Sequence, residues 1–297
     1  MVWLWFALGL IAAFLFGANA VVVRYLALQG VSPFWIAFGR LAIGALALYP
    51  FLLLTGETQV FKIRKRLLVA VASLSVAANF FLFHYGLTLT FAGSAMVLEA
   101  TSPIFALLIL ALVFGDEIRK KEVLSVVIAA TGIFLVVFSP NPADQSAMFL
   151  GNLFEIGAAV TWAVFVVCSK KLLDHQKPLS ALVQVFTISA ALLTPTLFFI
   201  NPISLDSALL IVALGLFSTA LGYILYYEAL KRVSAITGML LFALSLFFAI
   251  LLGSAVLGEN LPFNAFIGVM LILIAIFLSK KEEHPAKTTT SVNKLRA

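Results

Sequence analysis

The chain has 297 residues, of which 63% are hydrophobic and only 11% are charged, and its mean hydropathy is +1.14. This composition excludes an ordinary soluble domain, in which about 25% of residues are charged, and a disordered chain, which is poor in apolar residues. The single cysteine, Cys168, excludes a disulfide framework and a cysteine-based metal cluster.

Ten apolar runs follow one another along the chain, each close to the roughly 20 residues that cross a bilayer as a helix. Leu, Ile, Val, Phe and Ala dominate them without strict alternation, which predicts helices instead of barrel strands. No Lys or Arg precedes Arg24, so the first run lacks the basic start of a signal peptide and is predicted to be retained. The predicted spans are 2–24, 33–54, 67–89, 94–114, 122–139, 150–169, 179–200, 206–228, 235–257 and 262–279.

The basic residues predict how these helices are oriented. All of the 19 Lys and Arg except Arg24 and Arg40 lie in alternate connections or after the last helix. The positive-inside rule then places both termini in the cytoplasm, as expected of a multi-pass protein of the cell membrane. A nucleic-acid partner is not expected, although the net charge is +6, because its footprint would gather basic residues on one face or tail.

The order of the helices predicts an internal duplication. Five helices per half is an odd number, so the halves would enter the membrane from opposite sides, as in inverted-repeat transporters. We expect one five-helix repeat over 1–139, a second over 140–279, and a mobile cytoplasmic tail over 280–297. The residues that match at offsets of 142 or 145 are Tyr85 and Tyr227, Phe105 and Phe247, Leu110 and Leu252, Glu117 and Glu259, Pro33 and Pro178, and Pro50 and Pro195.

Short motifs rich in small residues occur within the predicted helices and at their ends. They are Phe16-Gly17-Ala18-Asn19, Ala92-Gly93-Ser94-Ala95, Ser102-Pro103-Ile104-Phe105, Phe114-Gly115-Asp116-Glu117, Ala130-Thr131-Gly132 and Leu257-Gly258-Glu259. In these motifs the chain resembles the ten-helix EamA-type branch of the drug/metabolite transporter superfamily, with departures at Phe16 and Ser245. The resemblance implies secondary transport of a small metabolite without ATP hydrolysis, and a central cavity between helices one, three, four, six, eight and nine.

Five polar side chains on five predicted helices share one depth, on the order of 8–10 Å below the outer surface. They are Asn19, Arg40, His84, Glu99 and Glu155. Ionisable residues inside a membrane helix cost free energy and are usually functional. We therefore predict a substrate and coupling network of Glu99, Arg40, His84 and Asn19, with protons as a candidate coupling ion. The repeat mates of the charged members carry no charge, so the symmetry of the scaffold does not require this layer.

Each of these residues also has a structural interpretation. Arg40 could extend its guanidinium to the headgroups, His84 could be a satisfied packing residue, and Glu155 could lie at the membrane interface near the outer loop. Glu99 is the hardest to explain without a function, because it lies beside the kink expected at Ser102-Pro103.

Hydroxyl and aromatic residues, and not charged ones, form the predicted cavity wall in the inner half of the bundle. Thr219, Tyr223 and Tyr226 form one stripe on their helix, and Trp162 lies near the middle of another. Tyr226 would equally suit an interfacial aromatic belt. With Ser102, these four residues are the predicted wall. The 28 Phe mean that aromatic content indicates nothing about the substrate.

The sequence predicts no cofactor, no metal site and no enzymatic activity. It has no phosphate-binding loop and no His-Glu-x-x-His motif, and its three His do not cluster. The leading hypothesis is therefore a carrier that moves an amino-acid-like, amine or drug-like solute as an exporter or exchanger. The alternatives are a passive channel, which would need a continuous polar path, and an intramembrane enzyme acting through Glu99 and His84. Both a monomer and a homodimer fit the sequence.

Overall fold

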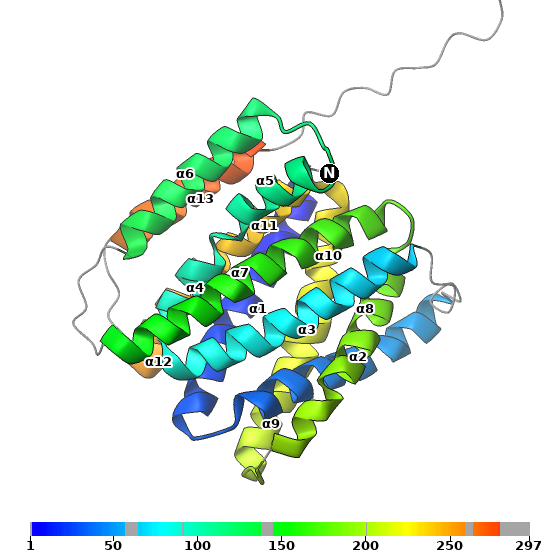
Figure 1. The fold of residues 1–297 in the computed structure, drawn as a ribbon, viewed down its shortest axis with the longest axis vertical. Helices are drawn as coiled ribbons and strands as arrows, with labels where there is room; N and C mark the ends of the chain where they lie inside the picture. Colours follow the sequence, from blue (N-terminus) through cyan, green and yellow to red (C-terminus); the bar gives the residue numbers. More distant parts are fainter. Residues whose placement is uncertain are drawn as a thin grey trace, which may run out of the picture.

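The computed structural model describes residues 2–56, 65–90, 92–137, 145–199, 201–258 and 264–279, and every regular element in these ranges is a helix (Figure 1). The predicted tail and the Glu259 position lie outside the described residues. The elements are α1 (Val2–Leu28), α2 (Pro33–Thr55), α3 (Arg66–Leu89), α4 (Ala92–Glu99), α5 (Ser102–Leu112), α6 (Lys120–Val137), α7 (Gln145–Leu173), α8 (Pro178–Leu193), η2 (Thr194–Phe199), α9 (Leu205–Ala213), η3 (Leu214–Leu221), α10 (Gly222–Arg232), α11 (Ala235–Ala243), α12 (Ser245–Leu257) and α13 (Asn264–Ser279).

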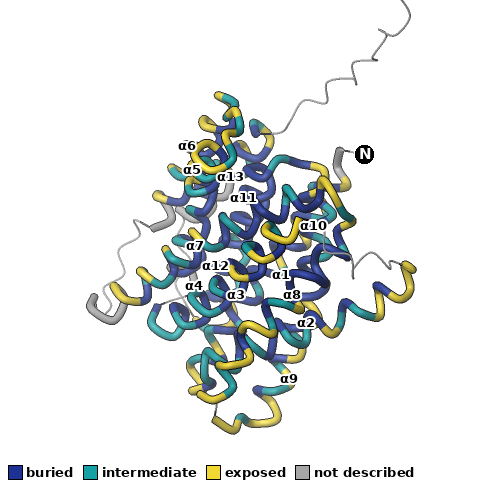
Figure 2. The backbone as a smooth tube through the Cα atoms, turned by 45° about the vertical axis from the view of Figure 1, so that its right-hand side comes forward, coloured by how far each residue is buried: buried dark blue, intermediate teal, exposed yellow. Residues whose placement is uncertain are grey.

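The helices have the length and the surface of membrane spans. Within the described ranges, eight helical stretches are long and apolar enough to cross a bilayer, and Met270–Ser279 is a shorter apolar helix. Large apolar side chains also cover the outside of the bundle, where Leu54 is 84% exposed and Leu112 is 81% exposed. Figure 2 shows the exposed positions on the periphery and the buried ones within. An apolar exterior around a packed interior is expected of helices that face lipid.

Two predicted helices are interrupted, and one of the interruptions lies at the kink expected beside Ser102-Pro103. The run 94–114 is divided into α4 and α5 at Ala100-Thr101, because Pro103 has no N–H to donate and the Thr101 hydroxyl donates to the Leu98 carbonyl at 2.6 Å. The run 235–257 is divided into α11 and α12 at Leu244, and here no proline is present. The two interruptions occur at places that the 142-residue offset makes equivalent.

The run 206–228 is also irregular, because its centre, η3, is a π-helix. Gly215 in this segment faces α2 so closely that an added Cβ would lie 2.6 Å from a methyl group of Ile43. The wider turn brings Ser218 and Thr219 toward α2, where both contact Arg40. Single π-turns inside helices are often found at functional sites.

The helices pack in pairs that combine the two halves of the chain. α3 lies along α7, α6 along α13, α2 along α8, and α1 against α10 and α12. Small residues permit these approaches: an added Cβ at Gly17 would lie 2.6 Å from the Ser245 carbonyl oxygen, and one at Gly132 would lie 2.8 Å from that of Gly268. The core between these pairs is where the site lies.

Candidate functional site

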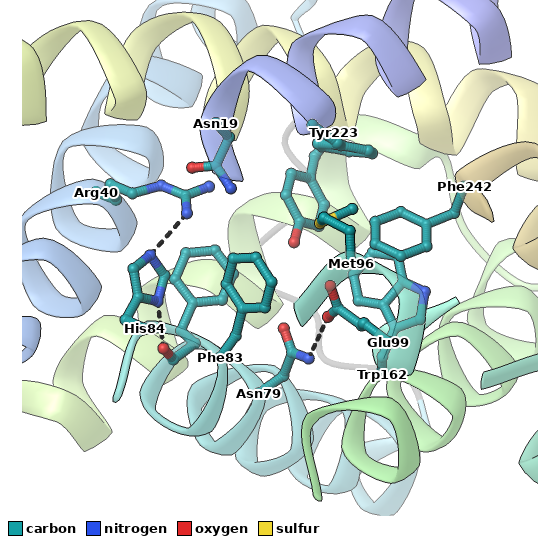
Figure 3. Close-up of a pocket in the computed structure, with 12 residues that line it drawn as sticks. Asn19, Arg40, Asn79, Phe83, His84, Met96, Glu99, Trp162, Tyr223 and Phe242 are labelled. Atoms are coloured by element: carbon teal, nitrogen blue, oxygen red, sulfur yellow. Dashed lines mark hydrogen bonds between the residues drawn. The ribbon is translucent and has the colours of Figure 1, made fainter. Parts of the chain in front are cut away.

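A small cavity lies in the centre of the bundle, between α1, α2, α3, α4, α7, α10 and α11. The free space within it is enough for about one water molecule. Figure 3 shows its walls. The lining residues are Phe16, Asn19, Arg40, Asn79, Phe80, Phe83, His84, Met96, Glu99, Trp162, Tyr223 and Phe242.

Arg40 forms one side of the cavity, and its guanidinium is held at several points. Nη1 lies 2.8 Å from Nε2 of His84, while Nε and Nη2 donate to the Thr219 and Ser218 hydroxyls, each at 3.3 Å. The guanidinium carbon lies 4.8 Å from the centre of the Phe80 ring, within range of a cation–π interaction. Arg40 is therefore positioned by α3 and η3, and its side chain is buried within the bundle.

His84 supports Arg40 and has no nitrogen left for another partner. Its Nδ1 contacts the carbonyl oxygen of Phe80, which can only accept, so Nδ1 carries the proton. Its Nε2 then accepts from the Arg40 guanidinium. In this arrangement His84 is a neutral imidazole that orients Arg40.

Glu99 occupies a different side of the cavity, at the end of α4. Its Oε1 accepts a hydrogen bond of 2.9 Å from Nδ2 of Asn79, and the same Nδ2 lies 3.0 Å from the carbonyl oxygen of Ala158. Within the described ranges Glu99 makes no ion pair, and neither does Arg40. Figure 3 shows the two side chains projecting into the cavity from separate sides.

Aromatic rings complete the wall on the α1, α7, α10 and α11 side. The Phe16 ring is central, with its centroid 5.0 Å from that of Tyr223 and 5.6 Å from that of Phe242. Trp162 packs against Phe242 in a tilted arrangement, with a centroid distance of 4.4 Å. Rings of this kind can surround an apolar group or the face of an organic cation.

Several buried polar atoms around the cavity have no hydrogen-bond partner in the described part of the chain. They include Asn19 Oδ1 and Trp162 Nε1, which belong to lining residues, and the Tyr226 hydroxyl behind the aromatic wall. Unsatisfied buried groups are rare in native structures and call for an explanation. A bound ligand would explain these two atoms if it donated a hydrogen bond to Asn19 Oδ1 and accepted one from Trp162 Nε1.

The structure brings together the four residues predicted for substrate and coupling, because Asn19, Arg40, His84 and Glu99 all line the cavity. The predicted wall residues are distributed differently. Trp162 and Tyr223 line the cavity, Thr219 contributes through its bond to Arg40, and Tyr226 packs behind Phe16 and Trp162. Ser102 is buried but is not part of the lining.

Sequence reasoning missed one polar residue of the cavity, Asn79, which was detectable as an amide in an apolar helix, five residues before His84. Glu155 was recognised as part of the polar layer but was left out of the predicted network. It is 0% exposed, and neither carboxyl oxygen has a hydrogen-bond partner in the described part of the chain. It lies against Gly86, where an added Cβ would collide with the carboxyl group. Its burial depends on the close approach of α3 and α7, which the sequence alone does not specify.

Apolar helices long enough to cross a membrane around a central polar cavity are expected of a multi-pass membrane transporter. The EamA-like transporter family matches residues 3–138 and again 149–280, so the chain belongs to this family and, with it, to the drug/metabolite transporter superfamily.

Individual relatives agree with this assignment. A Clostridium kluyveri protein named an uncharacterized transporter is 24% identical, with 95% of each chain covered. The S-adenosylmethionine uptake transporter of Rickettsia prowazekii is 25% identical over 70% of this chain and 68% of its own length. One solved crystal structure matches with a TM-score of 0.67 at 19% identity, covering 90% of this chain and 95% of the other, which shows the same fold.

Proposed function

We propose that this protein is a secondary carrier that exports or exchanges a small zwitterionic, amino-acid-like metabolite by alternating access, driven by protons. The observation that carries the proposal is the pair of separated charges in one cavity. A buried Arg40 and a buried Glu99 project from different sides, and neither is neutralised by an ion pair in the described residues. Unpaired buried charges are costly, so a ligand that pairs with both would stabilise the closed site.

The chemistry of the two sides gives the ligand an orientation. A carboxylate would meet the donors of Arg40, because a guanidinium fork matches a planar carboxylate. An ammonium group would meet Glu99, with the aromatic wall beside it. The relative named an S-adenosylmethionine transporter is consistent with this pattern, since S-adenosylmethionine carries an amino-acid group. Glu99, whose one hydrogen-bond partner among the described residues is Asn79, is our candidate for the group that exchanges a proton.

We propose ten membrane helices arranged as two inverted five-helix repeats, with both termini in the cytoplasm. Support comes from the interruptions of α4–α5 and α11–α12 at equivalent places. It also comes from the family match, which falls into two segments of similar length. Rocking of one group of helices against another would expose the central cavity to each side in turn.

A passive channel is the competing function, and the cavity argues against it. Conduction needs a continuous polar path, whereas apolar rings close much of this cavity and little free space remains. A small central site lined by charged and aromatic side chains instead suits a carrier that surrounds its substrate.

Binding can be tested with the purified protein in detergent, using amino acids, their methyl esters and their decarboxylated amines as probes. A zwitterion that binds the folded state should raise the temperature of unfolding. The methyl ester carries an uncharged ester in place of the carboxylate, and the decarboxylated amine has no carboxyl group at all. Neither probe should therefore stabilise the protein. Arg40→Gln should abolish the stabilisation, while Thr131→Ala, an exposed position, is the matched control.

Transport is tested by counterflow in proteoliposomes, using a radiolabelled amino acid that stabilises the protein. Saturable uptake that accelerates with unlabelled amino acid on the far side is expected of a carrier. Flux that rises linearly with the gradient and shows no exchange would favour the channel. Equal stabilisation by the amine and by the amino acid would contradict the zwitterionic substrate.

A further inference from the structure

Two basic side chains make the same kind of contact near the ends of two long helices. Near the end of α1, Nη1 of Arg24 donates to the carbonyl oxygens of Leu87 at 2.9 Å and Thr88 at 3.5 Å. Near the end of α7, Nζ of Lys170 donates to the carbonyl oxygens of Leu230 at 3.0 Å and Lys231 at 3.1 Å. Each cation meets carbonyls at the C-terminal end of another helix, where unpaired carbonyls and the helix dipole favour positive charge. We name these contacts the Arg24 clamp and the Lys170 clamp.

The internal repeat makes the two clamps equivalent. Lys170 follows Arg24 by 146 residues, and the accepting carbonyls of α10 follow those of α3 by 143 residues. Both spacings are close to the offsets of 142 and 145 at which other residues match. The same contact therefore occurs once in each half of the chain, although the donor is Arg in one and Lys in the other.

The two clamps lie at opposite ends of the bundle, because α3 and α7 run antiparallel. Leu89, at the end of α3, faces Gly151 near the start of α7, and Asn79 bonds to Ala158 farther along α7. The C-terminal ends of α3 and α7 thus point in opposite directions. The cavity lies between these ends, lined by α1, α3, α7 and α10 among others.

Each clamp also connects two different groups of helices. α3 packs along α7, and α1 packs along α10 and α12. The Arg24 clamp joins α1 to α3, and the Lys170 clamp joins α7 to α10. Both clamps therefore bridge the same two groups, one at each end of the cavity.

The side chains of Arg24 and Lys170 are only half-buried, unlike that of Arg40. A half-buried ammonium or guanidinium group can exchange a carbonyl for water without leaving an unpaired charge in the interior. Breaking the hydrogen bonds of such a clamp therefore costs little free energy. The fully buried Arg40 has no such exchange available.

We infer that Arg24 and Lys170 are paired gate residues: releasing the Arg24 clamp opens the cavity at one end, and releasing the Lys170 clamp opens it at the other. The inference rests on the proposed alternating-access function. Both clamps are closed in this structure, in agreement with the small free space of the cavity. The clamps position the helix groups and do not touch the substrate site, since neither residue lines the cavity.

The experiment measures cysteine labelling at each end by a water-soluble maleimide, without substrate. Cys168 is buried two residues before Lys170 and reports on one end. For the other end, Val23→Cys in a Cys168→Ser background introduces a reporter at a buried position next to Arg24. Lys170→Gln should accelerate labelling of Cys168 about tenfold. Arg24→Gln should do the same for the cysteine introduced by Val23→Cys, and neither substitution should accelerate labelling at the far end.

Controls separate a gate from a structural cap. Arg24→Lys and Lys170→Arg keep the cation and should restore slow labelling. Lys171→Gln removes the neighbouring ion pair with Asp116 and should leave the labelling of Cys168 within about twofold of the parent. Unchanged labelling in both Gln variants, or equal acceleration at both ends, would overturn the inference. Because no substrate is used, failure of the zwitterion proposal would leave the labelling result unaffected.

Discussion

Arg40 and Glu99 are buried charged groups of one cavity, yet the protein surrounds them very differently. Arg40 has three side-chain hydrogen-bond partners, from α3 and η3, and an aromatic ring beside its guanidinium. In the part of the chain that the structure describes, Glu99 has one hydrogen-bond partner, the Asn79 amide. The nearby carboxyl group of Glu155 has no hydrogen-bond partner in the described residues. The cationic side is thus held by the protein itself, and the acidic side is left to be completed by a ligand ammonium or a proton.

The largest effect should follow Glu99→Gln, which removes the charge and keeps the size of the side chain. We expect the variant to fold and to lose the dependence of uptake on an imposed pH gradient, because an amide cannot exchange a proton as a carboxyl group does. Uptake of a radiolabelled amino acid into proteoliposomes, with and without the gradient, measures this. If the gradient drives the variant as well as the parent, Glu99 is not the coupling residue.

Arg40→Lys should have the next largest effect, and this effect should be a loss of folding stability. An ammonium group is a point charge and cannot reproduce the geometry of a guanidinium bound at three nitrogens. The loss of charge-assisted hydrogen bonds should lower the free energy of unfolding by about 1.5–3 kcal/mol. Denaturant or thermal unfolding in detergent measures the loss, with the exposed Arg66→Lys as the matched control. An unchanged stability would show that the three contacts do not hold Arg40.

Gly86→Ala tests the tight packing of the acidic side. The added methyl group would collide with the Glu155 carboxyl group, so we expect a loss of about 1–3 kcal/mol from overpacking. Glu155→Ala removes the colliding atoms, so the double variant should recover part of that loss. A double-mutant cycle of the two substitutions should therefore give an interaction energy different from zero. Strictly additive effects would mean that Gly86 and Glu155 do not share this contact.

The sequence predicted much of this cavity because polar residues are so rare in the chain. Asn19, Arg40, His84 and Glu99 stood out as exceptions in apolar helices, and their common depth follows from the helix rise alone. How Arg40 and Glu99 are separated was not predictable. It depends on the π-turn of η3, which directs Ser218 and Thr219 to Arg40, and on Asn79, which reaches Glu99 from α3. Such contacts are set by the rotation of each helix about its axis, and an almost uniformly apolar sequence leaves that rotation weakly specified.

The smallest effect should follow Thr219→Val, which removes one hydroxyl from the cationic side at nearly constant volume. The 3.3 Å bond from Arg40 Nε would be lost, while the contacts with His84 and Ser218 remain. We expect a decrease of about 0.5–1.5 kcal/mol in the free energy of unfolding, with transport retained. Combining Thr219→Val with Ser218→Ala should cost more than the sum of the single changes, since each hydroxyl partly compensates for loss of the other. A collapse of transport in Thr219→Val alone would mean that the cationic side is as sparsely supported as the acidic one, and the contrast between Arg40 and Glu99 would then fail.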